Sequence, residues 1–377
     1  MSDKQTVKFG DICREVKLTT KDPIADGYER YIGLEHLDSG SLKIKRWGII
    51  EEDNPSFTRV FKKGHILFGK RRPYLKKAAI AEFNGICSGD IIVMEPTGGG
   101  IDPEIFPYIC QSDDFWEFAV KNSSGSLSPR TKYAYLKNYE LSKISVDEQE
   151  KCLAIIENIS DVLTQIDGMN DSLQSLRNRT LNQLFSDNAT AKNEVSGQKI
   201  FKIFGGHAPS NITFNEEGDL GYFKVDDFNK NKDHGKIRIS SEKFTAAEQE
   251  KNIGILKKGF LVFPKRGAAI FKNRVGILDV DGSIDSNLMA LECLGVEPNY
   301  LRVFLEWFGL HNISDNSGIP QINNKHVYPL LVPTFNDGHR QKIVQFESNI
   351  SDINGNLDKK RNNLESIVRQ ITKVFKV

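Results

Sequence analysis

The sequence lacks the features that usually identify a secreted, membrane-spanning or metal-binding protein. Its five cysteines are scattered, with no CxxC pair and no Cys/His ligand spacing, so neither a disulfide framework nor a metal site is expected. No apolar run is long enough to cross a bilayer, and the first residues contain no signal-peptide core. These absences favour a cytoplasmic protein with free thiols, no bound metal ion and no membrane partner.

Motifs of nucleotide-dependent and metal-dependent enzymes are also missing. The chain has no GxxxxGK[ST] loop and no HExxH pair. The nearest match to the Asn/Asp-Pro-Pro-aromatic element of adenine methylation is the stretch 54–57, Asn-Pro-Ser-Phe, which lacks the second proline. No catalytic residues of its own are therefore expected, although a self-contained DNA methyltransferase or nuclease remains an alternative.

The chain has almost no excess charge of either sign. Fifty-one Lys and Arg residues balance 50 Asp and Glu residues, which leaves a net charge of +1. That balance excludes a polycationic surface as a whole but allows local basic patches. With 377 residues, of which 39% are hydrophobic, the chain can form two or three hydrophobic cores.

What the sequence does contain is an internal repeat, offset by roughly 190 to 200 residues. The stretch Tyr31–Leu37 is matched by Tyr222–Phe228, and Lys62–Arg71 is matched by Lys257–Arg266. Further matches join Asn122–Gly125 to Asp315–Gly318 and Ile159–Asp161 to Ile350–Asp352. A duplicated module predicts two similar surfaces, and therefore a ligand with two similar halves.

Each repeat is followed by a stretch with the heptad spacing of a coiled coil. Possible capping boxes at Ser145–Glu148 and Thr334–Asp337 predict the two helix starts. Apolar residues then alternate at spacings of three and four, the a/d pattern of paired helices. The positions expected to pair are Ile155, Ile159, Val162, Ile166, Met169, Leu173 and Leu176, and Phe346, Ile350, Ile353, Leu357, Leu364, Ile367 and Ile371. The alternative, helices lying on separate cores, suits a two-position seam less well.

These patterns predict an α+β fold, in which two similar mixed α/β domains are separated by an antiparallel two-helix coiled coil with pseudo-two-fold symmetry. The expected parts are a first domain (1–145), a first spacer helix (146–185), a polar linker (186–198), a second domain (199–334) and a second spacer helix (335–377). Helices of about 35 to 40 residues would form a rod roughly 50 to 60 Å long. Such a rod spans more than one turn of B-DNA, about 34 Å.

Two stretches rich in cations contain no acidic residue, 61–80 and 257–274, and they occupy matching places in the repeat. Duplex DNA suits such patches, because neutralised phosphates release counterions and Arg can bind guanine in a bidentate pair. Solvated strand ends are the alternative. The residues expected to contact DNA here are Lys70, Arg71, Arg72, Tyr74, Lys76, Lys265, Arg266, Lys272 and Arg274.

A second pair of stretches, 122–132 and 315–325, is rich in hydroxyl, amide and cationic side chains. Such groups can donate to phosphates, and Asn or Gln can read adenine. Ordinary turns are the alternative. The residues expected to contact DNA from these loops are Ser126, Ser128, Arg130, Lys132, Gln321, Asn323 and Lys325.

The order of these motifs resembles the specificity (S) subunit of type I restriction–modification systems. The resemblance rests on Gly64–Leu75, Cys87–Asp90 and Ser124–Lys132, on Gly205–Ser210 in the second half, and on the long helix after each repeat. It implies two target recognition domains that each read half of a bipartite, asymmetric DNA sequence. It further implies that the helices set the spacing and dock two methyltransferase (M) subunits.

The same resemblance implies cofactors outside this chain. S-adenosylmethionine would be held by the M subunits, and ATP with magnesium would be used by restriction (R) subunits that join the complex. A coiled-coil adaptor that binds only proteins is a further alternative. The recognised bases and the spacer length do not follow from the sequence.

Overall fold

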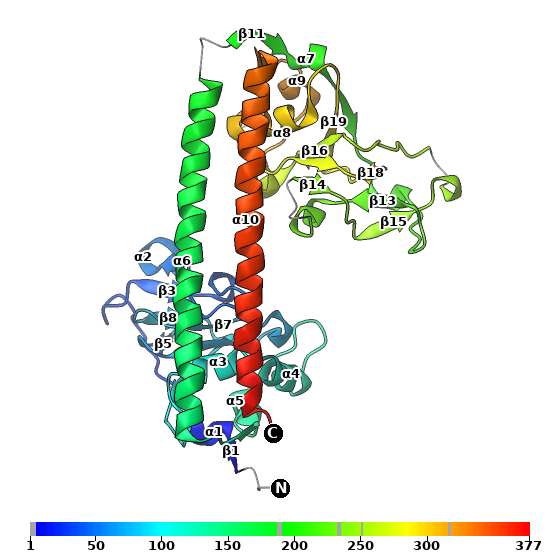
Figure 1. Cartoon of the computed structure of the whole chain (residues 1–377). Helices are drawn as coiled ribbons and strands as arrows, with labels where there is room; N and C mark the ends of the chain where they lie inside the picture. The colour runs from blue at the N-terminus through cyan, green and yellow to red at the C-terminus, as the bar shows by residue number, and fades with distance from the viewer. Residues whose placement is uncertain (1–4, 187–190, 232–234, 250–251, 316–317) are drawn as a thin grey trace. The chain divides into compact units, whose positions relative to one another are not determined.

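The computed structural model describes residues 5–186, 191–231, 235–249, 252–315 and 318–377. The chain divides into unit 1, Met1–Gln165 with Lys360–Val377, and unit 2, Ile166–Lys359. Each unit contains one mixed α/β module and part of both long helices, α6 (Val146–Phe185) and α10 (Asp337–Thr372) (Figure 1). Two mixed α/β modules with two long helices confirm the predicted fold class.

The module of unit 1 is built on two four-stranded sheets, with orders β2-β9-β6-β7 and β4-β3-β8-β5. Along β6, Ile66 and Phe68 belong to one hydrophobic core and Leu67 to another, because successive strand residues point to opposite faces. The strands are β2 (Cys13–Glu15), β3 (Arg30–Ile32), β4 (Gly48–Ile49), β5 (Arg59–Phe61), β6 (Ile66–Gly69), β7 (Ala78–Ile80), β8 (Gly85–Cys87) and β9 (Ile91–Pro96).

Short helices complete this module. On the helix of residues 113–121, Phe115 and Trp116 are buried in the core, as their aromatic character predicts, and Trp116 stacks on Phe68 with ring centroids 4.2 Å apart. The helices are α1 (Phe9–Ile12), α2 (Ile50–Asp53), α3 (Phe106–Cys110), α4 (Asp113–Lys121) and α5 (Tyr133–Leu136), with 3₁₀ turns η1 (Leu34–His36) and η2 (Pro73–Leu75).

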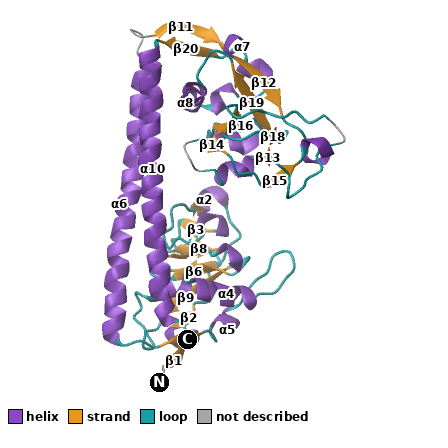
Figure 2. Cartoon of the chain, turned by 45° about the vertical axis from the view of Figure 1, so that its right-hand side comes forward, coloured by secondary structure: helices purple, strands orange, loops and turns teal. Residues whose placement is uncertain are grey.

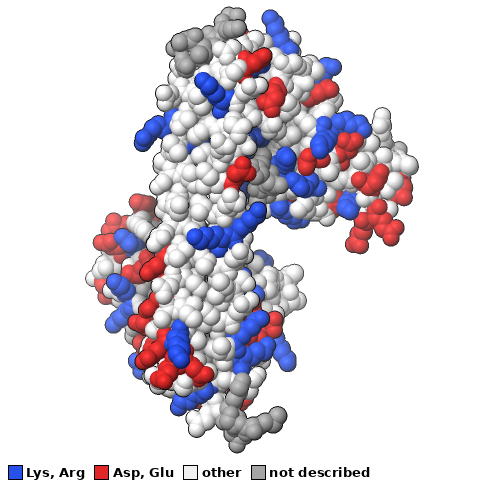
Figure 3. All heavy atoms as spheres, in the orientation of Figure 1, with Lys and Arg blue, Asp and Glu red and all other residues white. Residues whose placement is uncertain are grey.

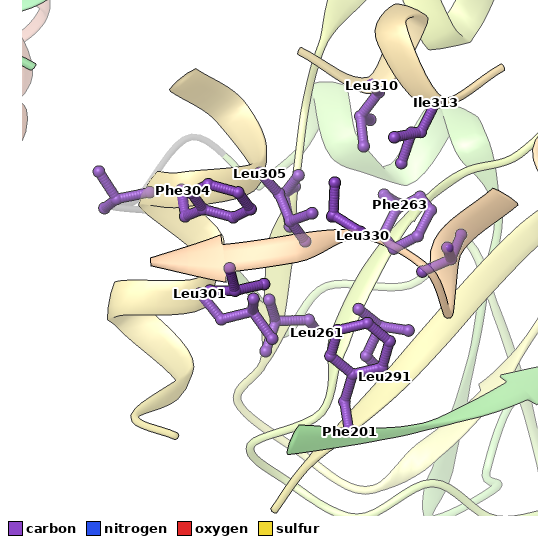
Figure 4. Packing of buried hydrophobic residues seen from close by; sticks show 14 of the residues in the cluster. Phe201, Leu261, Phe263, Leu291, Leu301, Phe304, Leu305, Leu310, Ile313 and Leu330 are labelled. Atoms are coloured by element: carbon purple, nitrogen blue, oxygen red, sulfur yellow. The ribbon is translucent and has the colours of Figure 1, made fainter. Parts of the chain in front are cut away.

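The module of unit 2 has a five-stranded sheet, β12-β19-β16-β17-β14, and a three-stranded sheet, β15-β13-β18 (Figure 2). Side chains from its strands, from α8 (Pro298–Phe308) and from the segment that leads to α10 form one core, in which Phe263, Leu301 and Phe304 are almost fully buried (Figure 4). The strands are β12 (Phe201–Gly205), β13 (Leu220–Phe223), β14 (Lys236–Ile237), β15 (Glu242–Phe244), β16 (Leu261–Pro264), β17 (Gly276–Leu278), β18 (Gly282–Ile284) and β19 (Leu288–Cys293).

The remaining elements of unit 2 are helical. Apart from the long helices they are α7 (Gly197–Ile200), α8 (Pro298–Phe308) and α9 (Asn324–Val327), with 3₁₀ turns η3 (Pro209–Asn211), η4 (Val225–Asn229), η5 (Ala246–Glu248), η6 (Gly267–Lys272) and η7 (Leu310–Ile313). In the tail of unit 1, η8 (Lys373–Phe375) follows α10.

The internal repeat is reproduced in the strand pairing. In unit 1, Tyr31 of β3 pairs in parallel with Ile86 of β8, and in unit 2 the matching Tyr222 of β13 pairs in parallel with Ser283 of β18. Each module is also closed by an antiparallel ladder, β1 (Thr6–Lys8) with β10 (Glu140–Ser142), and β11 (Ala191–Ser196) with β20 (Leu331–Phe335). The sequence repeat therefore reflects a repeated topology.

Part of the expected linker has regular structure. Of residues 186–198, positions 187–190 lie outside the described residues, whereas 191–196 form β11, and Val195 pairs with Val332 of β20. The stretch consists mainly of small and polar residues, a composition that predicts a linker. A strand partner more than 130 residues away leaves no signal in such a local composition.

The long helices begin close to their expected positions. A capping box is present at α6, where the Ser145 amide donates to Glu148 Oε2 at 2.9 Å and the Glu148 amide donates to Ser145 Oγ at 3.3 Å. The expectation for the second helix was wrong in detail. Asn336, rather than Thr334, caps α10 by accepting the amide hydrogen of His339 at 2.9 Å.

Within unit 2 the two helices are antiparallel neighbours (Figures 1 and 2). Arg177 of α6 bonds Glu347 of α10, with Nε 2.8 Å from Oε2, while Leu184, further along α6, lies beside the earlier His339 of α10, with its carbonyl oxygen 2.8 Å from Nε2. Because sequence numbers rise along one helix as they fall along the other, the helices run in opposite directions. In unit 1, Leu153 of α6 and Phe375 after α10 share one core.

The buried face of the helices differs from the expected a/d seam. Ile156, Leu181 and Phe185 are buried although they lie off that seam, and the last two belong to the core of the unit 2 module. The helices therefore pack on the modules as well as on each other. Of the residues expected to pair, the buried ones are Ile159, Ile166 and Ile350, the half-buried ones are Val162, Leu173, Phe346, Leu357, Leu364 and Ile371, and the exposed ones are Ile155, Met169, Leu176, Ile353 and Ile367.

A buried cluster of four charges joins both helices to the unit 2 module. Arg177 bonds Glu347 and also Glu306 of α8, whose Oε2 is 3.0 Å from Arg177 Nη2 and 3.0 Å from Arg302 Nη1. None of the four side chains is more than 16% exposed. Burial raises the pKa of Glu306 above its ordinary value, despite the two guanidinium groups beside it.

Candidate nucleic-acid interface

The basic segment after β6 and the hydroxyl-rich loop, far apart in the sequence, lie side by side in unit 1. The Thr131 amide donates to the Lys70 carbonyl at 3.0 Å, and the Arg72 amide donates to the Pro129 carbonyl at 2.7 Å. Between them Arg71 and Arg130 form an antiparallel bridge. We call residues 70–72 with 129–131 the first clamp.

Unit 2 repeats this arrangement bond for bond after β16. The Ile322 amide donates to the Lys265 carbonyl at 2.9 Å, and the Gly267 amide donates to the Pro320 carbonyl at 2.9 Å. Arg266 and Gln321 form the intervening antiparallel bridge. Residues 265–267 with 320–322 are the second clamp. The pairing makes Arg71 equivalent to Arg266 and Arg130 equivalent to Gln321.

In each module a third segment contacts the clamp, and its residue at the point of contact differs between the two modules. The Lys70 amide donates to the Asp90 carbonyl at 2.9 Å, and the Lys265 amide donates to the Asn287 carbonyl at 2.9 Å. Asp90 and Asn287 therefore occupy equivalent places, but only Asp90 carries a charge. Asn287 Nδ2 donates to Asp285 Oδ1 at 2.6 Å.

The Asp90 carboxylate organises the cations of the first clamp. It accepts hydrogen bonds from Arg130 Nε at 2.8 Å and from Arg130 Nη2 at 3.2 Å, and Arg71 Nη1 lies 3.6 Å away. Arg71 Nη2 also donates to Ser128 Oγ at 3.2 Å. The hydrogen bonds from Arg130 hold the pKa of Asp90 below its ordinary value, so this carboxylate stays ionised at neutral pH.

The lysines at the start of the two clamps share an environment. Lys70 and Lys265 are both half-buried, and burial lowers the pKa of each below the ordinary lysine value. A half-buried ammonium group offers less surface to a phosphate than an exposed one. The exposed cations of the clamps, Arg72, Arg130 and Arg266, are therefore better placed for an outside ligand.

The other expected DNA contacts have varied surroundings. Lys76 is held by Asp113, with Nζ 2.6 Å from Oδ1, and Arg274 Nη1 donates to Asn229 Oδ1 at 2.8 Å. Ser128 is half-buried against Arg71. The remaining expected side chains lie exposed on the clamp loops or beside them, and they are Tyr74, Ser126, Lys132, Lys272, Asn323 and Lys325.

The backbone at the clamps is constrained. Arg72 has φ +52°, and the equivalent Gly267 has φ +68°, so both lie in the left-handed region. A residue with a Cβ atom adopts this conformation at a cost, whereas glycine does so freely. Sparsely populated backbone conformations of this kind cluster at functional sites.

Several exposed side chains near the clamps were missed by the sequence reasoning. Leu127 and Ile319, which precede Pro129 and Pro320 in the two loops, are 89% and 67% exposed, and Phe271 is 63% exposed. The roles of Asp90 and Asn287 were missed as well. Asp90 does lie in the stretch 87–90, one of those on which the family resemblance rests, but the sequence does not show which residues it contacts, because those contacts depend on strand pairing.

The described residues provide neither a metal site nor a membrane-spanning helix. Figure 3 shows Lys and Arg side chains interspersed with Asp and Glu on the displayed face. The His, Cys, Asp and Glu side chains that the structure describes form no group of three or more that could hold a metal ion. None of the described helices has the length and the apolar character needed to span a bilayer.

Type I restriction–modification proteins are among the matches to a curated protein and to solved structures. No protein-family model matches the chain. A stretch of 172 residues, 45% of the chain, is 25% identical to the type I restriction enzyme EcoDI specificity subunit of Escherichia coli. That match covers 38% of the curated relative, so the chain spans well under half of the length of that protein.

Solved structures resemble the chain over nearly its whole length. A chain from a structure of a type I restriction–modification system aligns with a TM-score of 0.57 and 18% identity, over 98% of this chain and 97% of that one. The S subunit of a type I system from M. genitalium aligns with a TM-score of 0.50 and 15% identity, over 99% and 96% of the two chains. The chain therefore shares the fold of these proteins.

Proposed function

We propose that the chain is the DNA-recognition subunit of a type I restriction–modification complex, and that it is not itself catalytic. Each module reads one half of a bipartite, asymmetric target in duplex DNA. The observation that carries the proposal is the pair of clamps, which present cations from equivalent places in two modules of otherwise different sequence. The fold shared with type I S subunits supports it.

The partners and cofactors follow from that role. Helices α6 and α10 set the separation of the two half-sites and dock two M subunits, which hold S-adenosylmethionine. R subunits that use ATP and magnesium join this complex to cleave DNA. Exposed apolar side chains on the helices, such as Ile155, Met169 and Leu176 of α6, support a protein partner on this surface.

Binding of the assembled complex to its target duplex tests the proposal. Arg71→Ala combined with Arg266→Ala removes one equivalent cation from each clamp. We expect weaker binding and a shallower dependence of affinity on salt, since roughly one counterion is released for each phosphate neutralised. A matched control is Lys21→Ala combined with Lys199→Ala, which removes the same charge from exposed positions outside the clamps.

Equal affinity and equal salt dependence for the clamp variant and the control would contradict the assignment of the interface. Methylation of DNA by the purified chain with S-adenosylmethionine and no partner would establish a self-contained enzyme instead. A complex that selects no duplex sequence at all would favour an adaptor that binds only proteins.

A further inference from the structure

Arg130 and Gln321 occupy equivalent backbone positions of the two clamps but carry different side chains. Arg130 bridges Arg71 and exchanges two backbone hydrogen bonds with Ser124. Gln321 bridges Arg266, its carbonyl accepts from the Asp315 amide at 2.9 Å, and its amide donates to Asp315 Oδ1 at 2.9 Å. The bridge to Arg71 or to Arg266 thus fixes the position in the same way in both modules. The two modules differ in the side chain at this position, which is a guanidinium group in unit 1 and an amide in unit 2.

The neighbouring residue varies together with it. Arg130 stands beside Asp90, which accepts two of its hydrogen bonds, and Gln321 stands in the module where the equivalent residue is the neutral Asn287. No residue that the structure describes forms a hydrogen bond with the side-chain amide of Gln321. The ion pair of Arg130 with Asp90 in the first module thus has two neutral residues, Gln321 and Asn287, at the equivalent places of the second.

The donors left over on Arg130 have a defined number and place. A guanidinium group has five N–H donors. Asp90 uses the one on Nε and one on Nη2, and the Ser128 carbonyl lies 3.4 Å from Nη1. One hydrogen on Nη1 and one on Nη2 remain, which is the adjacent pair that guanine O6 and N7 accept in the major groove.

A glutamine at the same place offers one donor and one acceptor. That combination matches adenine, which presents its N6 amino group and N7 side by side in the major groove. An uncharged residue such as Asn287 at the place of Asp90 suits it, because no cation needs to be held in position. The two clamps are therefore complementary to different purines.

We infer that Arg130 reads a guanine in one half-site and that Gln321 reads an adenine at the matching place of the other half-site. The inference rests on the proposed function, and it assigns the bases that the function leaves open. Asp90 is a positioning residue, since it fixes the guanidinium group without contacting DNA. An ion pair that merely locks the loop would carry no preference for a base.

The first test is the target of the unaltered chain, co-purified with the proteins encoded beside its gene. Selection from a library of random duplexes yields both half-sites. The inference expects a guanine in one half-site and an adenine in the other, each with a discrimination on the order of 10- to 100-fold over the wrong base. A half-site for unit 1 without guanine, or one for unit 2 without adenine, would overturn it.

The second test exchanges the side chains at the equivalent positions of the two clamps. Arg130→Gln with Asp90→Asn gives the first clamp the residues of the second, so one guanine of the selected sequence should become adenine while the other half-site stays unchanged. The reciprocal variant, Gln321→Arg with Asn287→Asp, should convert one adenine to guanine. The unchanged half-site in each experiment reports that the protein is folded.

Arg130→Lys is the conservative variant. It keeps the positive charge but loses the bidentate fork, so it should relax the preference at one base by a factor of roughly 10 or more while overall affinity for phosphates persists. Exchange variants that select the unaltered sequence would refute the inference and leave the proposed function standing. If the unaltered complex selects no sequence, the proposed function fails with it.

Discussion

Loss of Arg177 should destabilise unit 2 strongly, because this residue balances two buried carboxylates. Arg177→Met keeps much of the apolar stem but leaves Glu347, 6% exposed, without the guanidinium group that it contacts at 2.8 Å. Of its two arginine partners, Glu306 keeps Arg302. Removing one partner of a buried pair typically costs about 3–5 kcal/mol, because the remaining charge stays desolvated.

The equivalent positions of unit 1 show which apolar residues can replace this ion pair. The repeat that equates Ile159 with Ile350 also equates Glu347 with Ile156 and Arg177 with Val368. Unit 1 therefore has aliphatic residues where unit 2 has this ion pair. Arg177→Met combined with Glu347→Ile should recover most of the lost stability, since well-packed apolar residues often replace a buried pair at little cost.

Thermal unfolding of the full chain measures the effect. For a unit of this size, a loss of about 3–5 kcal/mol corresponds to a fall in Tm of roughly 6–20 °C. Hydrogen exchange followed by mass spectrometry separates peptides of unit 2 from those of unit 1, and only the former should lose protection. A loss below about 1 kcal/mol, the value of an exposed pair, would refute the reasoning.

The cost should also depend on pH. Burial raises the pKa of Glu306 in the folded protein, and removal of Arg177 raises it further. A carboxyl whose folded pKa is raised contributes stability below its unfolded pKa and loses it as the pH rises through the folded pKa. The Arg177→Met variant should therefore lose more stability at pH 8 than at pH 5, and an equal loss at both would contradict this account.

Three further changes test local features. Ser145→Ala should cost about 0.5–2 kcal/mol in urea unfolding by removing the cap of α6, and no loss would mean that the cap is dispensable. Gly267→Ala should cost about 1 kcal/mol or more, because φ is +68° there. Burial lowers the pKa of His36 and His65, so the stability that their neutral forms give unit 1 should fall as the pH drops below about 6.5; a flat profile would contradict this.

The sequence was most informative where a pattern is local or duplicated. The capping box at Ser145 and the aromatic residues of α4 were predictable, since helix starts and amphipathic spacing depend on neighbours within one or two turns. The two-module organisation was predictable from the repeat itself. In each case the signal and the structure that it predicts occupy the same stretch of chain.

The sequence was least informative where distant segments meet. Strand β11 depends on β20, and the polarity of 191–196 gives no sign of that pairing. Heptad spacing predicts one narrow seam, but Leu181 and Phe185 pack on the unit 2 module, so a helix with two neighbours buries a wider face. The basic residues and the loops were found separately. Only the tertiary structure shows that they lie side by side in the clamps and that Asp90 bonds Arg130.

The last residues of unit 1, 360–377, are separated in sequence from the rest of that unit by the whole of unit 2. Phe375 is buried in the core of that module, Ser142 Oγ donates to the Lys376 carbonyl at 2.8 Å, and Leu141 bridges Lys376. All residues of unit 2, by contrast, are contiguous from 166 to 359. The later module is therefore continuous in sequence, whereas the earlier one needs residues 360–377 to complete its core and so cannot finish folding before they are synthesised.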